Sequence, residues 1–225
     1  MSILLSIETA TPTCSVALHS DGVLLGKITI EKGYSHSSIL NKAIENLLQL
    51  AGVTYKELSA VAVSKGPGSY TGLRIGTSTA KGLCYALDIP LISIETLKAM
   101  AKGIVNINNY LLCPMLDARR MEVYTSVFSP DLEVVSPIAP MILDQNSFSE
   151  FLNQQEVIFF GDGSNKFNQV VDNKNAYFIN NVQPDAEIIG ALAHEKYQHR
   201  SFENIAYFEP FYLKEFRATK PKSML

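Results

Sequence analysis

The residues whose types and spacing could do chemistry gather in one glycine-rich stretch, Ser64 to Gly82, with the sequence SKGPGSYTGLRIGTSTAKG. Gly66 and Gly68 precede a helical pattern, so backbone amides and the helix dipole there could bind a phosphate group. The stretch lacks the Gly-Lys-Ser/Thr ending of a Walker loop, and its G-x-G-x-x-x-G spacing differs by one residue from the dinucleotide fingerprint. Pro67 also removes one amide donor from the loop. This spacing favours tight turns and helix packing over a phosphate site.

The same stretch carries a stripe of small residues along its predicted helix. Glycines at positions 72, 76 and 82 each cost about 1 kcal/mol relative to alanine inside a helix. Gly72, Gly76 and Ala80 recur at i, i+4 and share one face, which lets another backbone, helix or ligand approach closely. A dinucleotide-binding module would instead bind a pyrophosphate at the loop before this helix and use Glu95 for a ribose hydroxyl. Docking of a partner helix and packing within the core both remain open as alternatives.

Other reactive side chains predict neither a metal site nor a catalytic residue. His194 and His199 are five residues apart, so on a helix they point about 140° away from each other. The three cysteines, Cys14, Cys84 and Cys113, are far apart and outside any CxxC spacing. That pattern predicts reduced thiols and a cytoplasmic protein.

Two polar turns could also contact an anion. Gly161-Asp162-Gly163-Ser164 follows an apolar run, and we interpret it as the cap of the next segment rather than a phosphate loop. Asp117-Ala118-Arg119-Arg120 lies between two strand patterns. A hairpin turn accounts for its polarity, although two adjacent arginines could reach a carboxylate or a phosphate.

Composition sets the broad class of the protein. The chain has 225 residues, of which 47% are hydrophobic, enough for one large domain or two small ones. A formal net charge of -3 gives no field that could hold nucleic acid unaided. The N-terminus has no basic leader, and no apolar stretch is long enough to cross a bilayer, so we expect neither secretion nor membrane insertion.

The elements that must position these residues begin with an α/β domain. Strand patterns alternate with helical patterns, and this order predicts a mixed sheet with helical cover, because parallel neighbours need a crossover. The strand patterns cover residues 2–8, 14–19, 23–31, 58–64 and 89–94, and the helical patterns cover residues 39–51 and 71–87. We place the end of this domain at residue 102.

A second domain, 103–225, is predicted to follow. It contains strand patterns at 110–116, 121–128 and 156–160 and a helix at 185–199. The last ~20 residues either pack back on the first domain or extend freely.

Several of these segments together resemble one known family. The segments IETATPTCSVAL, SHSSILNKAIENLL, KGPGSYTGLRIGTSTAKGL and LDARRMEVY resemble the TsaB (YeaZ) family in order and spacing, over about residues 3 to 128. The later FFGDGS and EPFYLKEF resemble it less distinctively. The resemblance implies an α/β actin-like ATPase (ASKHA, ribonuclease H-like) fold with two subdomains, the second truncated.

The resemblance also implies a function without chemistry of its own. TsaB proteins are the non-catalytic partners of TsaD, the subunit that transfers the threonylcarbamoyl group to an adenosine of tRNA. Where TsaD has its two metal-binding histidines, this chain has Thr96 and Met100, which implies that it holds no such metal. Glu8 takes the place of the acidic residue that lies near the nucleotide phosphates in ASKHA enzymes. We therefore expect no catalytic residue, bound cofactor or metal in this chain.

The partners implied are a TsaD-like catalytic subunit and a TsaE-like ATPase, with tRNA bound only through the complex and a homodimer when the chain is alone. Whether a nucleotide lies at the partner interface is left open. In the family the first two helices form the partner surface, and here that predicts an interface of nine residues: Leu40, Ile44, Leu47, Leu73, Gly76, Thr77, Ala80, Lys81 and Cys84. The alternative function is a small ASKHA-type metabolite kinase, which needs a general-base aspartate and a second phosphate motif.

Overall fold

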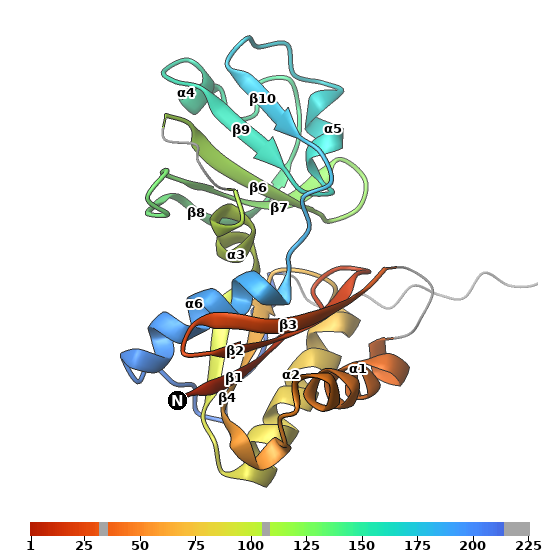
Figure 1. Cartoon of the computed structure of the whole chain (residues 1–225). Helices are drawn as coiled ribbons and strands as arrows, with labels where there is room; N and C mark the ends of the chain where they lie inside the picture. Colours follow the sequence, from red (N-terminus) through yellow and green to blue (C-terminus); the bar gives the residue numbers. More distant parts are fainter. Residues whose placement is uncertain (32–35, 105–108, 214–225) are drawn as a thin grey trace, which may run out of the picture.

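The computed structural model describes residues 1–31, 36–104 and 109–213 and has two lobes, each built on a five-stranded mixed sheet (Figure 1). The first sheet has the order β3-β2-β1-β4-β5. Its strands are β1 (Ile3–Glu8), β2 (Cys14–Ser20), β3 (Val23–Ile30), β4 (Leu58–Gly66) and β5 (Leu91–Glu95). β1 to β3 form an antiparallel meander, whereas β4 lies parallel to β1 and to β5. These strands and the first two helices lie within two residues of their predicted bounds, except that the first helix begins three residues early.

Helices cover both faces of the first sheet, which explains why β1 is apolar almost throughout. Alternate β1 residues, Ile3, Leu5 and Ile7, pack under α1 (His36–Ala51) and α2 (Tyr70–Leu87). Leu4, on the opposite face, packs against α6 (Ala186–Gln198). A strand buried on both sides shows a continuous apolar run rather than alternation.

The second lobe carries the sheet β10-β9-β6-β7-β8. Its strands are β6 (Leu111–Asp117), β7 (Glu122–Phe128), β8 (Val134–Ile142), β9 (Val157–Phe160) and β10 (Ala176–Ile179), and its two short helices are α4 (Ser149–Leu152) and α5 (Ser164–Asn168). A single-turn 3-10 helix, η1 (Tyr55–Glu57), lies in the first lobe. The predicted hairpin of β6 and β7 is confirmed.

The short helix α3 (Thr96–Lys102) joins the lobes through a shared core. Leu97, Met100 and Ala101 pack into the second lobe, while Ala99 packs with the first sheet and α6. All four side chains are at most 1% exposed. The contact between the lobes is therefore packed apolar surface rather than an open cleft at this point.

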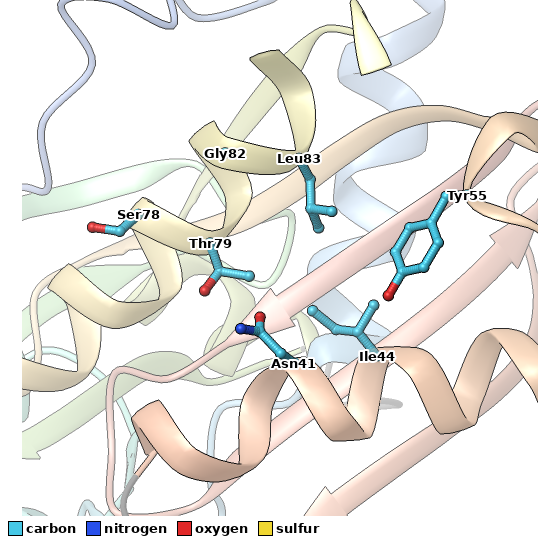
Figure 2. Close-up of a pocket in the computed structure, with 7 residues that line it drawn as sticks. All are labelled: Asn41, Ile44, Tyr55, Ser78, Thr79, Gly82 and Leu83. Atoms are coloured by element: carbon cyan, nitrogen blue, oxygen red, sulfur yellow. The ribbon is translucent and has the colours of Figure 1, made fainter. Parts of the chain in front are cut away.

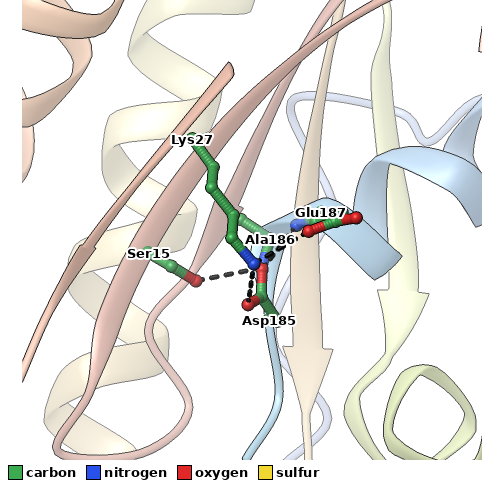
Figure 3. Close-up of polar contacts among 5 residues, drawn as sticks. All are labelled: Ser15, Lys27, Asp185, Ala186 and Glu187. Atoms are coloured by element: carbon green, nitrogen blue, oxygen red, sulfur yellow. Dashed lines mark hydrogen bonds and ion pairs between the residues drawn. The ribbon is translucent and has the colours of Figure 1, made fainter. Parts of the chain in front are cut away.

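The predicted boundary of the second domain, 103–225, is wrong at its C-terminal end. The chain re-enters the first lobe at α6, which covers the face of the first sheet opposite α1 and α2 (Figure 1). Ser15 Oγ accepts the Ala186 N–H at 2.9 Å, and Lys27 Nζ lies 2.8 Å from both Asp185 and Glu187 (Figure 3). These ion pairs are partly exposed and contribute at most about 1 kcal/mol each, so apolar packing holds α6 in place.

The segment after α6 lies against the first lobe as a strap, residues 199–213. The Glu203 N–H donates to Leu91 O at 2.8 Å, the Phe211 N–H donates to Lys65 O at 2.6 Å, and Phe208 joins the first core. Up to residue 213, the segment after α6 therefore packs back on the first lobe. Residues 214–225 lie outside the described residues.

Candidate functional site

Eight of the nine predicted interface residues lie in the core. Leu40, Ile44 and Leu47 of α1 are 1–3% exposed, and Leu73, Thr77, Ala80 and Cys84 of α2 are at most 5% exposed. Gly76 is buried as well. A side chain with almost no accessible surface cannot contact a partner directly. Any partner surface on these helices must therefore be formed by their neighbouring exposed residues. That a partner binds these helices stays a prediction.

The stripe at Gly72 and Gly76 serves packing inside the chain. Thr9 Oγ1, from the loop after β1, donates to Gly72 O at 2.8 Å. A Cβ at Gly76 would overlap Thr9 Oγ1. Of the alternatives left open by the sequence, the structure supports core packing for these two glycines, because the stripe faces the β1–β2 loop.

Lys81, the ninth predicted residue, binds the strap. Its Nζ donates to the carbonyl oxygens of Phe208 at 3.0 Å and of Ala206 at 3.4 Å. An ammonium group bound to two carbonyls of its own chain contributes to the fold of the first lobe rather than to an open surface.

The exposed side of α1 and α2 instead forms a groove of about 480 Å³ (Figure 2). We call it the helix groove and define it by its lining residues: Asn41, Ile44, Tyr55, Ser78, Thr79, Gly82 and Leu83. Ile44 forms part of its lining although the side chain is 1% exposed, and Asn41 extends from α1 toward Thr79 on α2. Large apolar side chains on the same two helices are open to solvent, since Leu50 is 81% and Tyr85 84% exposed.

Gly82 is the helical glycine that the fold does not explain. A Cβ built there meets nothing within 4 Å, and the residue is exposed in the C-terminal half of α2. Glycine costs about 1 kcal/mol relative to alanine at such a position. The groove at Gly82 therefore allows an unusually close approach by another molecule. Sequence reasoning selected the stripe at positions 72, 76 and 80 and gave Gly82 no separate role, although Gly82 lies outside that stripe.

Two amides between the end of β4 and the first turn of α2 bond within the chain, in agreement with the tight turns and helix packing that the spacing favours. The Ser69 N–H donates to Ala10 O at 2.7 Å, and the Gly72 N–H donates to Ser69 Oγ at 3.3 Å. These amides at the start of α2 are thus not free to bind a phosphate. Glu95, the candidate ribose ligand of the dinucleotide alternative, forms an ion pair with Lys65 at 3.2 Å.

Glu8 is a fully buried carboxylic acid beneath the β1–β2 loop. Its Oε1 accepts the Ala10 N–H at 2.6 Å and the Ser64 Oγ–H at 2.8 Å, while Oε2 has no partner within the described chain. Burial raises the pKa of Glu8 from 4.5 to about 7, and the nearby Asp185 carboxylate adds to this. A half-satisfied buried acid is more stable protonated, because the ionised form has lost its hydration.

Replacing Glu8 with glutamine is expected to remove a pH dependence of stability. Between about pH 4.5 and pH 7 the folded chain binds the Glu8 proton and the unfolded chain releases it, so the free energy of unfolding falls as pH rises. A pKa raised from 4.5 to about 7 corresponds to roughly 3 kcal/mol. We expect the free energy of unfolding of Glu8→Gln, minus that of the wild type, to increase by up to that amount between pH 5 and pH 8. Urea denaturation at each pH measures both values.

The wild type and Glu8→Gln must be compared at each pH because His19 acts in the opposite direction. Burial lowers the pKa of His19, so its contribution to stability increases as pH rises toward 6.5. An equal pH dependence in wild type and Glu8→Gln would show that Glu8 is ionised in the folded protein at neutral pH.

Thr96 and Met100, which the resemblance matches to the TsaD metal ligands, are buried at 0% and 1% exposure, and Met100 packs in the core that joins the lobes. Neither side chain carries an imidazole. Within the described ranges, no group of three or more His, Cys, Asp or Glu residues is arranged to hold a metal ion.

The three cysteines are buried and free, which confirms the predicted absence of a disulfide. No helix of the described chain is long and apolar enough to cross a membrane.

Comparison with family models and known sequences gives consistent matches. The model of the family TsaD, tRNA N6-adenosine threonylcarbamoyltransferase, matches residues 31–222. The chain is 30% identical to the tRNA threonylcarbamoyladenosine biosynthesis protein TsaB of Bacillus subtilis, over 75% of each sequence. It is also 34% identical to the protein of the same name from Escherichia coli. That match covers 57% of this chain and 55% of the relative's length.

Solved structures match the fold. YeaZ from Pseudomonas aeruginosa superposes with a TM-score of 0.83 at 24% identity, covering 95% of this chain and all of that one. EutJ, an ethanolamine utilization protein of Carboxydothermus hydrogenoformans, gives a TM-score of 0.52 at 9% identity and covers 86% of this chain and 90% of that one. The fold is that of the actin-like ATPases.

Proposed function

The chain belongs to the TsaB (YeaZ) family of tRNA threonylcarbamoyladenosine biosynthesis proteins, and from this premise we propose that it is the non-catalytic subunit that binds and supports a TsaD-like threonylcarbamoyltransferase. Its role in this modification follows from the family. The transfer itself is carried out by the partner in this proposal, and the chain contributes a binding surface.

The helix groove is the observation that carries the proposal. It combines a partly exposed apolar side chain, Leu83, with open space at Gly82, and the same two helices carry exposed apolar side chains, as expected of a helix-docking surface. The transferase family model matches residues 31–222, so a transferase of that family shares this fold and has corresponding helices. Two such helix pairs can pack on each other in a pseudo-twofold arrangement, and two copies of this chain can pair in the same way.

The buried position of Thr96 and Met100 supports the non-catalytic part of the proposal. Both side chains are buried, and Met100 packs between the lobes, whereas a metal-dependent transferase would need an accessible site with nitrogen or oxygen ligands. We further propose that a TsaE-like ATPase joins the complex, that tRNA is bound through the complex, and that the assembly works in the cytoplasm.

The test is reconstitution with the TsaD-like and TsaE-like proteins of the same genome. The chain should co-purify with the TsaD-like protein, and threonylcarbamoyl transfer to unmodified tRNA should require all the subunits. The purified chain alone should show no transferase activity. A wild-type chain that never pairs would contradict the proposal, and ATP-dependent phosphorylation of a small metabolite by the lone chain would support the kinase alternative instead.

A further inference from the structure

The turn after β6 holds two adjacent arginines in a backbone conformation that arginine rarely adopts. Arg119 has φ 72° and Arg120 has φ 50°, both in the left-handed region. The turn closes through the Ala118 N–H, which donates to Glu122 O at 3.0 Å, and the Glu122 N–H, which donates to Arg119 O at 3.1 Å. A non-glycine residue costs roughly 1–2 kcal/mol in this region, and Asn-Gly is the usual sequence for two such residues in a hairpin.

Two acidic side chains beside this turn, Asp117 and Asp162, bond to groups other than the two guanidiniums. Asp117 Oδ1 accepts the Arg119 N–H at 2.5 Å and lies 2.7 Å from Lys166 Nζ. Asp162 Oδ1 accepts the Asp117 N–H at 2.8 Å. Both arginines are exposed, and neither guanidinium forms an ion pair within the described ranges. Among the residues that the structure describes, the turn thus presents two exposed guanidiniums without an ion-pair partner.

The turn lies where α/β sheets usually bind ligands. β6, β9 and β10 are parallel, and the Arg119–Arg120 turn follows the carboxyl end of β6. Ligands of such sheets bind outside the carboxyl ends of the strands. The chain enters α6 of the first lobe soon after the carboxyl end of β10, so this end of the second sheet is directed toward the first lobe (Figure 1).

We propose that Arg119 and Arg120 bind a phosphate group, and specifically a backbone phosphate of the tRNA in the assembled complex. This proposal rests on the proposed function, which supplies the tRNA. A phosphodiester has two free oxygens that match the paired N–H groups of a guanidinium, and an exposed turn can reach a polymer backbone. A nucleotide offers the same phosphate chemistry, so the experiment has an arm for each source.

The test variant is Arg119→Asn/Arg120→Gly, which removes both guanidiniums and supplies the residues that prefer this backbone. It should fold with an unchanged or higher Tm, which separates a binding defect from a folding defect. In the complex with the TsaD-like subunit, its affinity for unmodified tRNA should fall about tenfold at 100 mM salt, and the slope of log K against log[salt] should decrease by about 1–2.

A matched control removes two positive charges elsewhere. Lys174→Asn/Arg200→Gly changes two exposed residues, and Arg200 also has a left-handed backbone with φ 54°. The control should bind tRNA within about twofold of the wild type.

Pairing with the TsaD-like subunit is measured separately, by isothermal titration calorimetry, and ATP binding is measured on both the complex and the lone chain. Weaker tRNA binding with normal pairing supports the proposal, and selective loss of ATP binding keeps the phosphate site but assigns it to a nucleotide. Unchanged binding of both tRNA and ATP overturns the proposal. A loss confined to pairing also overturns it, because the turn would then be a contact with the partner protein. If the wild type never pairs, the proposed function fails, and the tRNA and ATP arms on the lone chain then decide whether the phosphate site remains.

Discussion

Gly82→Arg is expected to weaken pairing with the TsaD-like subunit by about 30- to 700-fold while the chain stays folded. Gly82 is exposed, and its Cβ position is free of contacts, so an arginine there enters solvent in the lone chain. In a complex the same side chain would occupy the helix groove that the partner enters. Loss of a central contact costs about 2–4 kcal/mol, and 1.4 kcal/mol is tenfold in affinity. Calorimetric titration of the two purified proteins measures the change.

One control variant separates an interface effect from a general effect of the added arginine. Ser149→Arg adds the same side chain at an exposed position of α4 in the other lobe and should pair normally. Ala80→Arg is unsuitable, because Ala80 is fully buried and a guanidinium in the core would unfold the chain. Normal pairing by a folded Gly82→Arg protein would rule out the helix groove as the partner surface.

Gly161→Ala should destabilise the fold by about 3 kcal/mol or more, which lowers Tm by roughly 6–12 °C for a chain of this size. Gly161 has φ 98° in the turn after β9, so any side chain there is strained. A Cβ would overlap Met115 O and would lie 2.7 Å from the Met100 methyl group, which is packed between the lobes. The backbone of β6 has no room to move, because it pairs on both sides.

Gly52→Ala is the matched control for this effect. Gly52 also has a positive φ, 66°, but a Cβ there meets nothing within 4 Å. It should cost only about 1 kcal/mol in the free energy of unfolding, from backbone strain alone. Equal losses in the two variants, measured by urea denaturation, would show that the Met115 and Met100 contacts do not constrain the turn.

Local patterns in the sequence were enough to predict most of the helices and strands of the first lobe. The amphipathic repeat of α1, the short apolar runs of β4 and β5 and the Asp21-Gly22 turn each depend on neighbours within a few residues. β8 was missed, because Pro137 and Pro140 argue against a strand. β8 lies at the edge of its sheet, where a strand tolerates proline.

The sequence by itself determined the family, the α/β fold class, the absence of a disulfide and the two helices that carry the helix groove, because each of these depends on residue order and periodicity. Only the tertiary structure decided which side of each helix is open. Helical periodicity marks an apolar column without saying what covers it, so Leu40, Leu47 and Ala80 looked available although the first sheet buries them. The return of α6 to the first lobe and the bond between Lys81 and the strap join residues more than a hundred positions apart. Such contacts depend on how whole helices and strands pack, and a local pattern in a single sequence does not predict them.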